Sequence, residues 1–246
     1  MRFSHDHKFI LVNNWKCGCS SICSMFDEYV EPCGETRWTE HSMPADLPLR
    51  DKYMTEEFGS NYGQLVHARA TDIKKIFKKR GWNFDDYIKI TSVRNPWERM
   101  VSLYFYQVRM QKWTGKGRNV NKGGCFKYFP KNSDREPELV DFSEFARRSI
   151  PKWRSGIVNR WNTYEMIHDE EGTSLIDYVV RLENLEEDLE SIVRKHFPEF
   201  RIDYAIKQNT TEHNHYSTYY NEESKAIVAD LWSYDIERWG YKFENE

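Results

Sequence analysis

The 246-residue sequence has little of several features that define other protein classes. Only 12 glycines and 8 prolines, together with 39% hydrophobic residues, exclude a collagen-like repeat and a disordered chain. No apolar run approaches the roughly 20 residues of a membrane-spanning helix. The polar start of the chain also has no signal-peptide pattern. These absences predict a folded, soluble protein that stays in the cytoplasm and does not bind a membrane.

Cysteine is scarce as well, and its distribution is uneven. The five cysteines are Cys17, Cys19, Cys23, Cys33 and Cys125. A secreted disulfide framework usually has an even number of cysteines, so this set predicts reduced thiols in the cytoplasm. The first four could supply thiolates to zinc, but only the Cys19/Cys23 spacing fits the paired ligands of structural zinc sites. We therefore expect no metal site.

A large net charge is also missing, because the formal total is only −3. Between residues 69 and 131, however, the sequence contains sixteen basic and four acidic residues. This stretch carries +12, which leaves −15 for the rest of the chain. The near-neutral total therefore does not exclude an anionic partner, and the basic stretch predicts where one would bind.

Short apolar segments alternate with amphipathic ones along the chain. The pattern predicts strands at 8–13, 64–67, 87–93 and 177–182, and helices at about 20–29, 71–80, 96–111, 185–196 and 221–234. Such alternation predicts an α/β fold with a mainly parallel sheet flanked by helices, in a single domain over residues 1–246. The glycine-rich, basic segment at about 113–137 is predicted to be a mobile loop.

The first predicted strand runs into a short motif that is typical of an anion site. The motif is Lys16-Cys17-Gly18-Cys19-Ser20-Ser21. Gly18 lets the backbone approach a ligand closely, Lys16 adds a positive charge, and Ser20 or Ser21 can cap the helix that follows. The motif predicts phosphate or sulfate binding, although a helix cap beside a surface lysine is an equally simple interpretation. The Walker A pattern is absent, which argues against a kinase.

A second motif follows the strand at 87–93. Arg94 stands at its carboxyl end, where open α/β sheets bind ligands. Ser102 lies two turns into the next helix and could direct its hydroxyl to the same ligand. A planar guanidinium with a hydroxyl suits a dianionic phosphate, so the second motif favours the anion-binding interpretation of the first.

Together the two motifs resemble those of the sulfotransferases that use 3′-phosphoadenosine 5′-phosphosulfate (PAPS). Residues 16–21 are similar to the family's 5′-phosphosulfate loop, Pro-Lys-x-Gly-(Ser/Thr)-(Ser/Thr). The similarity to its 3′-phosphate motif runs through Val93-Arg94-Asn95-Pro96, Arg99, Ser102 and Tyr104. Similar stretches at 67–70, 181–185 and 209–241 favour the carbohydrate branch, which contains the heparan and chondroitin enzymes. Trp15 replaces the usual proline, and Cys19 replaces a serine or threonine.

The resemblance implies a fold, a reaction and a set of site residues. It implies a P-loop-like three-layer domain that moves a sulfuryl group from PAPS to an acceptor hydroxyl by in-line displacement. The product is adenosine 3′,5′-bisphosphate (PAP), no metal is needed, and Lys16 stabilises the leaving oxygen. The implied nucleotide-binding residues are Lys16, Cys17, Gly18, Cys19, Ser20, Ser21, Arg94, Ser102, Thr210 and Thr211.

A base must accept the proton of the attacking hydroxyl, and His67 is the first candidate. It follows a predicted strand inside a segment that resembles the family, and imidazoles ordinarily have a pKa of about 6.5, which suits this task. The simpler interpretation is a surface or capping histidine before the helix at 71–80. Glu183 and His213 are the alternative bases.

The predicted acceptor is a carbohydrate, and an acidic glycan would complement the basic charge. One candidate surface is the 113–137 loop, with Lys112, Lys116, Arg118, Lys122, Lys127 and Lys131 among Trp113, Phe126, Tyr128 and Phe129. The other comprises Arg147, Arg148, Lys152, Trp153, Arg154, Arg160 and Trp161. A solvated loop is an equally simple interpretation of the first.

Two other functions compete with sulfuryl transfer. The basic, aromatic stretch from 69 to 131 would also fit a nucleic-acid-binding module. That function leaves the Lys16 and Arg94 motifs without a purpose, so a nucleic-acid partner is disfavoured. The second alternative is a protein that binds the nucleotide without turnover, which the replacement at Cys19 makes conceivable.

Overall fold

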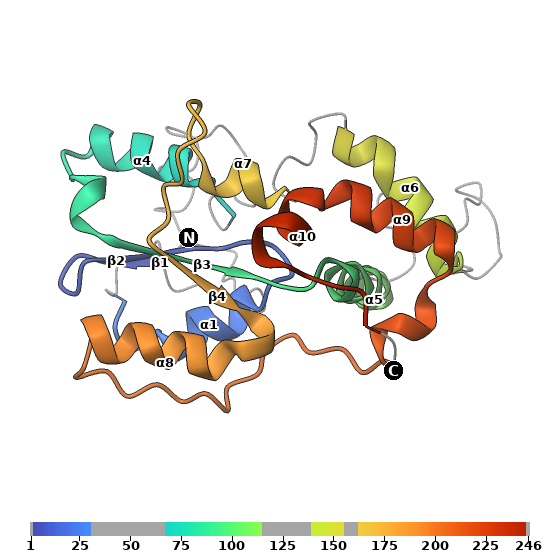
Figure 1. The fold of residues 1–246 in the computed structure, drawn as a ribbon. Helices are drawn as coiled ribbons and strands as arrows, with labels where there is room; N and C mark the ends of the chain where they lie inside the picture. The colour runs from blue at the N-terminus through green and yellow to red at the C-terminus, as the bar shows by residue number, and fades with distance from the viewer. Residues whose placement is uncertain (1, 31–66, 115–138, 155–161, 245–246) are drawn as a thin grey trace. The chain divides into compact units, whose positions relative to one another are not determined.

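The computed structural model describes residues 2–30, 67–114, 139–154 and 162–244, drawn in colour in Figure 1. The chain forms two compact units. The first unit contains residues 1–94 and 160–209, and the second contains 95–159 and 210–246. The single domain expected over the whole chain stays a prediction.

A four-stranded sheet forms the centre of the first unit, in the order β1-β2-β3-β4. The strands are β1 (Arg2–Ser4), β2 (Phe9–Val12), β3 (Ile88–Val93) and β4 (Tyr178–Arg181). β1 is antiparallel to β2, whereas β2, β3 and β4 are parallel to one another. All four residues of β2 are buried, as expected for a continuous apolar strand that is covered on both faces.

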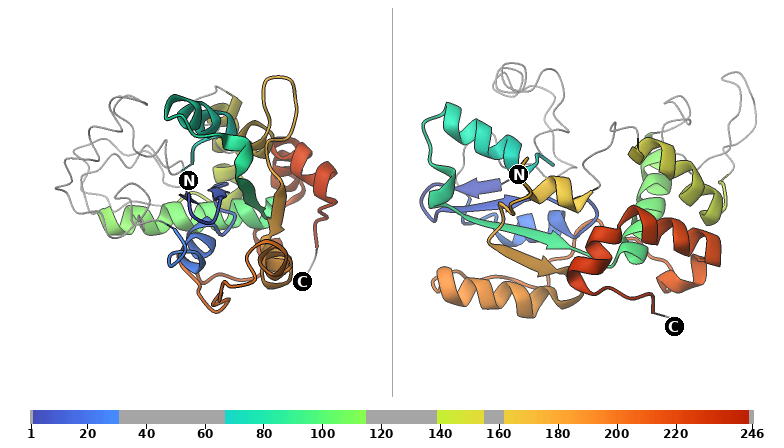
Figure 2. Two further views of the ribbon diagram at one scale, coloured as in Figure 1. Left: turned by 90° about the vertical axis from the view of Figure 1, so that its left-hand side faces the viewer. Right: turned by 45° about the horizontal axis from the view of Figure 1, so that its top comes forward.

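Helices cover both faces of this sheet (Figures 1 and 2). On one face lie α1 (Cys19–Met25) and α8 (Leu185–His196), and on the other lie α4 (Ala70–Lys79) and α7 (Thr163–Ile167). Phe9 packs with Phe26 and Leu189 in the α1/α8 layer, and Phe77 of α4 meets Phe3 edge-on. These layers confirm the predicted α/β fold with a mainly parallel sheet.

The second unit is helical among its described residues. Its helices are α5 (Pro96–Thr114), α6 (Phe142–Arg154), α9 (Glu222–Leu231) and α10 (Ser233–Trp239). Arg99 is fully buried here, with Nη1 3.7 Å from Asp235 Oδ1 and its guanidinium 5.0 Å from the centre of the Trp232 ring. Arg99, part of the run that resembles the 3′-phosphate motif, therefore belongs to the core of its own unit.

Three short 3₁₀ turns complete the described structure. They are η1 (Phe84–Asp86), η4 (Leu182–Asn184) and η5 (Tyr216–Tyr219). η1 leads into β3, and η4 joins β4 directly to α8. The short connection at η4 keeps residues 182–184 at the carboxyl edge of the parallel strands, where Leu182 lies against Gly18 of the loop after β2.

Several predicted boundaries are wrong. The first helix ends at Met25 rather than near residue 29, and the predicted helix at 221–234 is two helices, α9 and α10, separated at Trp232. α5 continues to Thr114, so the first two residues of the predicted 113–137 loop are helical and the rest lie outside the described residues. Of the predicted strand at 64–67 only His67 is described, and it lies in a turn.

Candidate anion-binding site

The loop after β2 has an unusual backbone conformation at two of its residues. Lys16 has φ 61° and Gly18 has φ 74°, in the left-handed region that favours glycine. A Cβ atom at Gly18 would also clash with the Leu182 side chain of η4, which would have to move to make room for it. Gly18 is itself the N-cap of α1, and no side chain caps this helix. The expected capping by Ser20 or Ser21 is therefore wrong.

Ser20 and Ser21 instead hold a distant segment of the first unit. Ser21 Oγ accepts a hydrogen bond from the Gln208 backbone N–H at 2.9 Å, and Ser20 Oγ accepts one from Asn209 Nδ2 at 3.2 Å. A hydroxyl that accepts a hydrogen bond still has its own proton to donate, so both can serve an anion as well. Thr210 is exposed and Thr211 half-buried. Both belong to the second unit, and their contact with a nucleotide stays a prediction.

The carboxyl end of β3 lies against the same loop. Arg94 is half-buried, and its Nη1 is 3.5 Å from the Lys16 carbonyl oxygen, a long hydrogen bond. Parallel β2 and β3 are paired in register up to Val12 and Thr91, which brings the residues after both strands to one edge of the sheet. The structure thus brings together two of the cationic residues that the sequence motifs singled out.

Asn95 and Pro96 end β3 and begin α5. Asn95 Oδ1 accepts hydrogen bonds from the backbone N–H groups of Trp97 at 3.0 Å and Glu98 at 3.4 Å, while Pro96 occupies the first helical position. The Arg-Asn-Pro order therefore combines a strand end with a helix start. Ser102 is buried in α5 of the second unit, and its predicted partnership with Arg94 stays a prediction.

His67 is buried, with an exposed fraction of 8%, so the surface-histidine interpretation is wrong. Its Nδ1 is 3.0 Å from the backbone oxygen of Asn13. Since a carbonyl only accepts hydrogen bonds, Nδ1 carries the proton and the neutral ring has its lone pair on Nε2. The ring also stacks on Trp15, with centroids 5.3 Å apart and planes 11° from parallel.

Two consecutive asparagines at the end of β2 anchor this arrangement. Asn14 is fully buried, and its Nδ2 donates to the Ser92 carbonyl at 3.2 Å and to Thr163 Oγ1 at 3.0 Å. Cys23 Sγ donates to Asn13 Oδ1 at 3.2 Å, and burial raises the pKa of the Cys23 thiol, which keeps the donated proton in place. The sequence analysis missed both asparagines. Their position directly after a buried strand is the signal that could have found them.

The alternative bases lie in different surroundings. Glu183 is exposed in η4 of the first unit. His213 belongs to the second unit, where it stacks on Phe105 at 5.2 Å and its Nδ1 lies 2.7 Å from the Asn214 carbonyl oxygen. Among the three candidates, only His67 is both buried and in contact with the segment that leads into Lys16.

The cysteines of the described chain are unbridged. Cys17 and Cys23 are buried and Cys19 is partly exposed, and none of the three is bonded to another described cysteine. Cys33 and Cys125 lie outside the described residues. Within the described ranges, no group of three or more His, Cys, Asp or Glu side chains is arranged to hold a metal ion. The described helices also include none that is both long and apolar enough to cross a bilayer.

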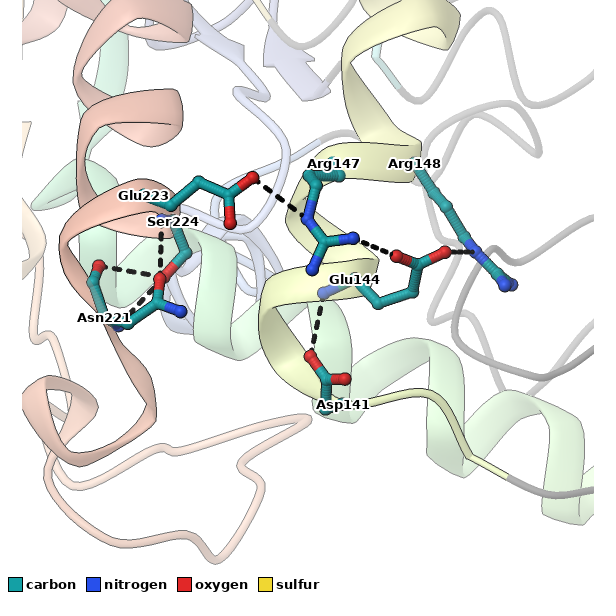
Figure 3. A network of polar contacts seen from close by, with 7 residues as sticks. All are labelled: Asp141, Glu144, Arg147, Arg148, Asn221, Glu223 and Ser224. Carbon is teal, nitrogen blue, oxygen red and sulfur yellow. Dashed lines mark hydrogen bonds and ion pairs between the residues drawn. The ribbon is translucent and has the colours of Figure 1, made fainter.

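The basic surfaces differ in whether acidic residues neutralise their charge. On α6, Glu144 pairs with Arg147 and, at 2.7 Å, with Arg148 Nε, while Arg147 Nε is 3.1 Å from Glu223 of α9 (Figure 3). Two arginines of the predicted 147–161 surface are therefore neutralised. The predicted surface on the 113–137 loop falls almost wholly outside the described residues, as do Arg160 and Trp161.

A different basic surface stands on α4. Its exposed positions are Lys74, Lys75, Lys78 and Lys79, and we call this set the α4 lysine face. In the described part of the chain, none of these lysines forms an ion pair. α4 begins three residues after His67, so the α4 lysine face is connected to the buried histidine by one short turn.

Comparison with known proteins places the whole arrangement in one family. A model of the sulfotransferase family matches residues 1–242, which include both units and every residue of the motifs described above. Neither the curated proteins nor the solved structures contain a match to the chain.

Proposed function

Because the chain belongs to the sulfotransferase family, we propose that it transfers the sulfuryl group of PAPS to a carbohydrate hydroxyl and releases PAP. The observation that carries this proposal is the meeting of the Lys16 loop with Arg94 at the carboxyl edge of the sheet. Two cationic residues from neighbouring parallel strands suit a ligand with several phosphate and sulfate groups. The odd number and uneven distribution of the cysteines support a cytoplasmic location, which we also propose.

The proposed reaction is one in-line displacement at sulfur. The acceptor oxygen attacks sulfur, and the bond between sulfur and the 5′-phosphate oxygen breaks with its electron pair on that oxygen. Lys16 stabilises the negative charge that develops there, and PAP leaves. The proton of the acceptor hydroxyl moves to Nε2 of His67, which the bond between Nδ1 and Asn13 leaves as the accepting atom.

The nucleotide contacts divide between the two motifs. Residues 16–21 would surround the 5′-phosphosulfate, with the hydroxyls of Ser20 and Ser21 donating to its oxygens. Arg94 and Ser102 would hold the 3′-phosphate. Thr210 and Thr211 would lie over the nucleotide, and their proximity in sequence to Asn209, which is bonded to Ser20, supports this assignment.

We also propose that the acceptor is an acidic glycan, and the α4 lysine face supports this. Lys74/Lys78 and Lys75/Lys79 are like-charge pairs four residues apart, and each such pair costs a helix about 0.2–0.5 kcal/mol. The first unit thus carries a self-repelling cationic surface close in sequence to His67. A polyanionic acceptor would relieve that repulsion.

Labelled PAPS tests the proposal directly. We expect the purified protein to move ³⁵S from PAPS to acidic glycans in preference to neutral glycans, phenols or small alcohols, and to bind PAP in calorimetry. Lys16→Ala should lower kcat by about 10²–10³-fold. Lys8→Ala is the matched control, because Lys8 flanks the other end of β2, also has a positive φ, and lies over the Tyr87 ring.

The same assays separate the competing functions. His67→Gln should abolish turnover while PAP still binds, and Arg94→Ala should weaken PAP binding. Absence of PAP binding would reject the proposal. PAP binding without turnover on any acceptor would instead indicate a nucleotide-binding protein. Salt-dependent oligonucleotide binding that PAP does not affect would indicate a nucleic-acid-binding module.

A further inference from the structure

We propose that Trp15 is a positioning residue, whose indole fixes the plane of the His67 imidazole and thereby the direction of Nε2. This inference rests on the proposed function, in which His67 accepts the acceptor proton. The observation that carries it is the stack of the two rings, 5.3 Å between centroids and 11° between planes, on a histidine that is almost fully buried.

One hydrogen bond alone does not determine where Nε2 points. The bond from Nδ1 to the Asn13 oxygen, 3.0 Å long, fixes one atom of the ring and sets the tautomer, but it permits the ring to turn about the bond. Stacking on a flat partner restrains that turn, because the imidazole cannot rotate out of its plane without losing its parallel contact with the indole. The two contacts together determine both the tautomer and the orientation.

Both contacts come from a single short stretch of backbone. Asn13 supplies the carbonyl, Trp15 supplies the ring, and Lys16 follows directly, so the proposed base and the proposed leaving-group cation share one scaffold. Asn14, between the two contacts, is bonded to Ser92 and Thr163 and holds that scaffold to β3 and α7. A misplacement of about 1 Å in such a site can lower a rate 10²-fold.

Trp15 is also one of the two positions at which the loop departs from the pattern it resembles, and proline is usual there. Proline has no aromatic face to lay against an imidazole. The replacement therefore gives this chain a means of holding the histidine that the usual loop residue does not provide.

A second tryptophan–histidine contact in the same unit offers a matched control. Trp82 meets His5 edge-on, with centroids 4.2 Å apart and planes at 71°. His5 follows β1 and Trp82 precedes β3, so this contact lies at the edge of the sheet opposite to Lys16. Trp82→Ala therefore removes a tryptophan from a histidine without touching the proposed site.

The test combines kinetics with nitrogen NMR of the full-length protein. We expect Trp15→Ala to lower kcat by about 10–100-fold, with little change in PAP affinity, and Trp15→Phe to restore most of the rate. In long-range ¹H–¹⁵N spectra, the His67 signals are identified by their loss in His67→Gln. They should show the tautomer protonated at Nδ1 in all three proteins, because the Asn13 bond sets it. The His67 ring signals should be sharp in the wild type and in Trp15→Phe, and broadened by exchange between ring orientations in Trp15→Ala.

Two results would overturn the inference. One is a wild-type kcat in Trp15→Ala. The other is a lowered kcat with His67 ring signals as sharp as those of the wild type, which would mean that Trp15 acts through the Lys16 loop. Trp82→Ala should leave both readouts unchanged. Because the NMR measurement needs no turnover, failure of the inference is distinguishable from failure of the proposed sulfuryl transfer, which shows as a lack of PAP binding in the wild type.

Discussion

One helix of each unit carries a cluster of positive charge, and the two clusters differ in whether acidic residues neutralise them. In the second unit, Arg99 is buried against Asp235, and Arg147 and Arg148 of α6 are paired with Glu144 and Glu223 (Figure 3). In the first unit, the α4 lysine face forms no ion pair with the described residues. Both α4 and α6 are amphipathic helices, so the difference does not come from the type of element.

This difference separates structural charge from charge that is available to a ligand. A cation with a fixed acidic partner contributes to folding. It attracts an anion in solution less strongly, because the partner cancels much of its charge. Lysines that repel one another on an exposed face contribute nothing to folding, and their field extends about 10 Å into the solvent at 0.1 M salt. The total of +12 between residues 69 and 131 therefore overstates the binding surface, since it includes Arg99.

The largest expected effect is the loss of stability on removing Asp235, the acidic partner of the buried Arg99. Asp235→Ala leaves the fully buried Arg99 without its carboxylate, so the free energy of unfolding should fall by about 3–5 kcal/mol. Urea denaturation measures this change. Glu237→Ala, an exposed position of the same helix, is the control and should change the free energy by less than about 0.5 kcal/mol. Equal stability of the two variants would show that the Arg99–Asp235 pair is not structural.

The α4 lysine face should show the next largest effect, on binding rather than folding. Replacing Lys74, Lys75, Lys78 and Lys79 by Gln removes four exposed cations, each worth about 0.2–1 kcal/mol in an ion pair. Affinity for chondroitin sulfate in low salt should then fall by about fourfold to several hundredfold. PAP affinity should not change. An unaltered affinity for chondroitin sulfate would remove α4 from the acceptor surface.

The neutralised arginines of α6 should show the reverse behaviour. Arg147→Gln/Arg148→Gln removes partners of Glu144 and Glu223, so the free energy of unfolding should fall by about 0.2–1 kcal/mol per exposed pair. Binding of chondroitin sulfate should stay within twofold of the wild type. A loss of binding as large as that of the α4 variant would mean that fixed pairs and unpaired lysines are equally available to the ligand.

The smallest effect concerns His196, a histidine of the first unit whose pKa is lowered. Lys195 Nζ donates to Tyr178 Oη at 3.0 Å, and Tyr178 Oη in turn lies 2.6 Å from His196 Nε2. Burial and, next, the charge of Lys195 lower the pKa of His196. The folded protein therefore binds this proton more weakly than the unfolded chain does.

It follows that acid should destabilise the protein through His196. As the pH falls below about 6.5, the ordinary pKa of histidine, the unfolded state takes up a proton before the folded state does, and the free energy of unfolding decreases. The loss is complete below the lowered pKa of the folded state. Denaturation at a series of pH values measures the slope, which His196→Gln should reduce. An identical slope in the variant would exclude this histidine as its source.

Local patterns in the sequence predicted much of the first unit. The apolar run of β2, the β-branched run of β3 and the periodic pattern of α8 each specify an element through neighbouring residues, and all three are present. The break between α9 and α10 was missed because Trp232 belongs to the same periodic pattern as the residues before it. Its burial against Arg99 shows that tertiary packing makes this position part of the core.

The contacts around the candidate site could not be predicted from local sequence patterns in the same way. Sequence motifs pointed to His67 and Lys16, but the contacts that fix His67 join it to residues 54 and 52 positions away, and the Asn14–Thr163 hydrogen bond joins residues 149 apart. Nothing in the local composition around Asn14 or Thr163 indicates the other partner. The basic content of α4 was counted, but its lack of acidic partners is a property of the folded surface.

By itself, the sequence determined the α/β class, the strands β2, β3 and β4 and the two motifs after β2 and β3, because each depends on residues that are adjacent in the chain. Tertiary structure alone decided that His67 is buried with its Nδ1 on Asn13, that Trp15 lies against its ring, and that Arg99 is a core residue. The physical reason is that burial, the choice of tautomer and the pairing of charges depend on which distant residues share a small volume. The fold of the backbone determines which distant residues are brought together there.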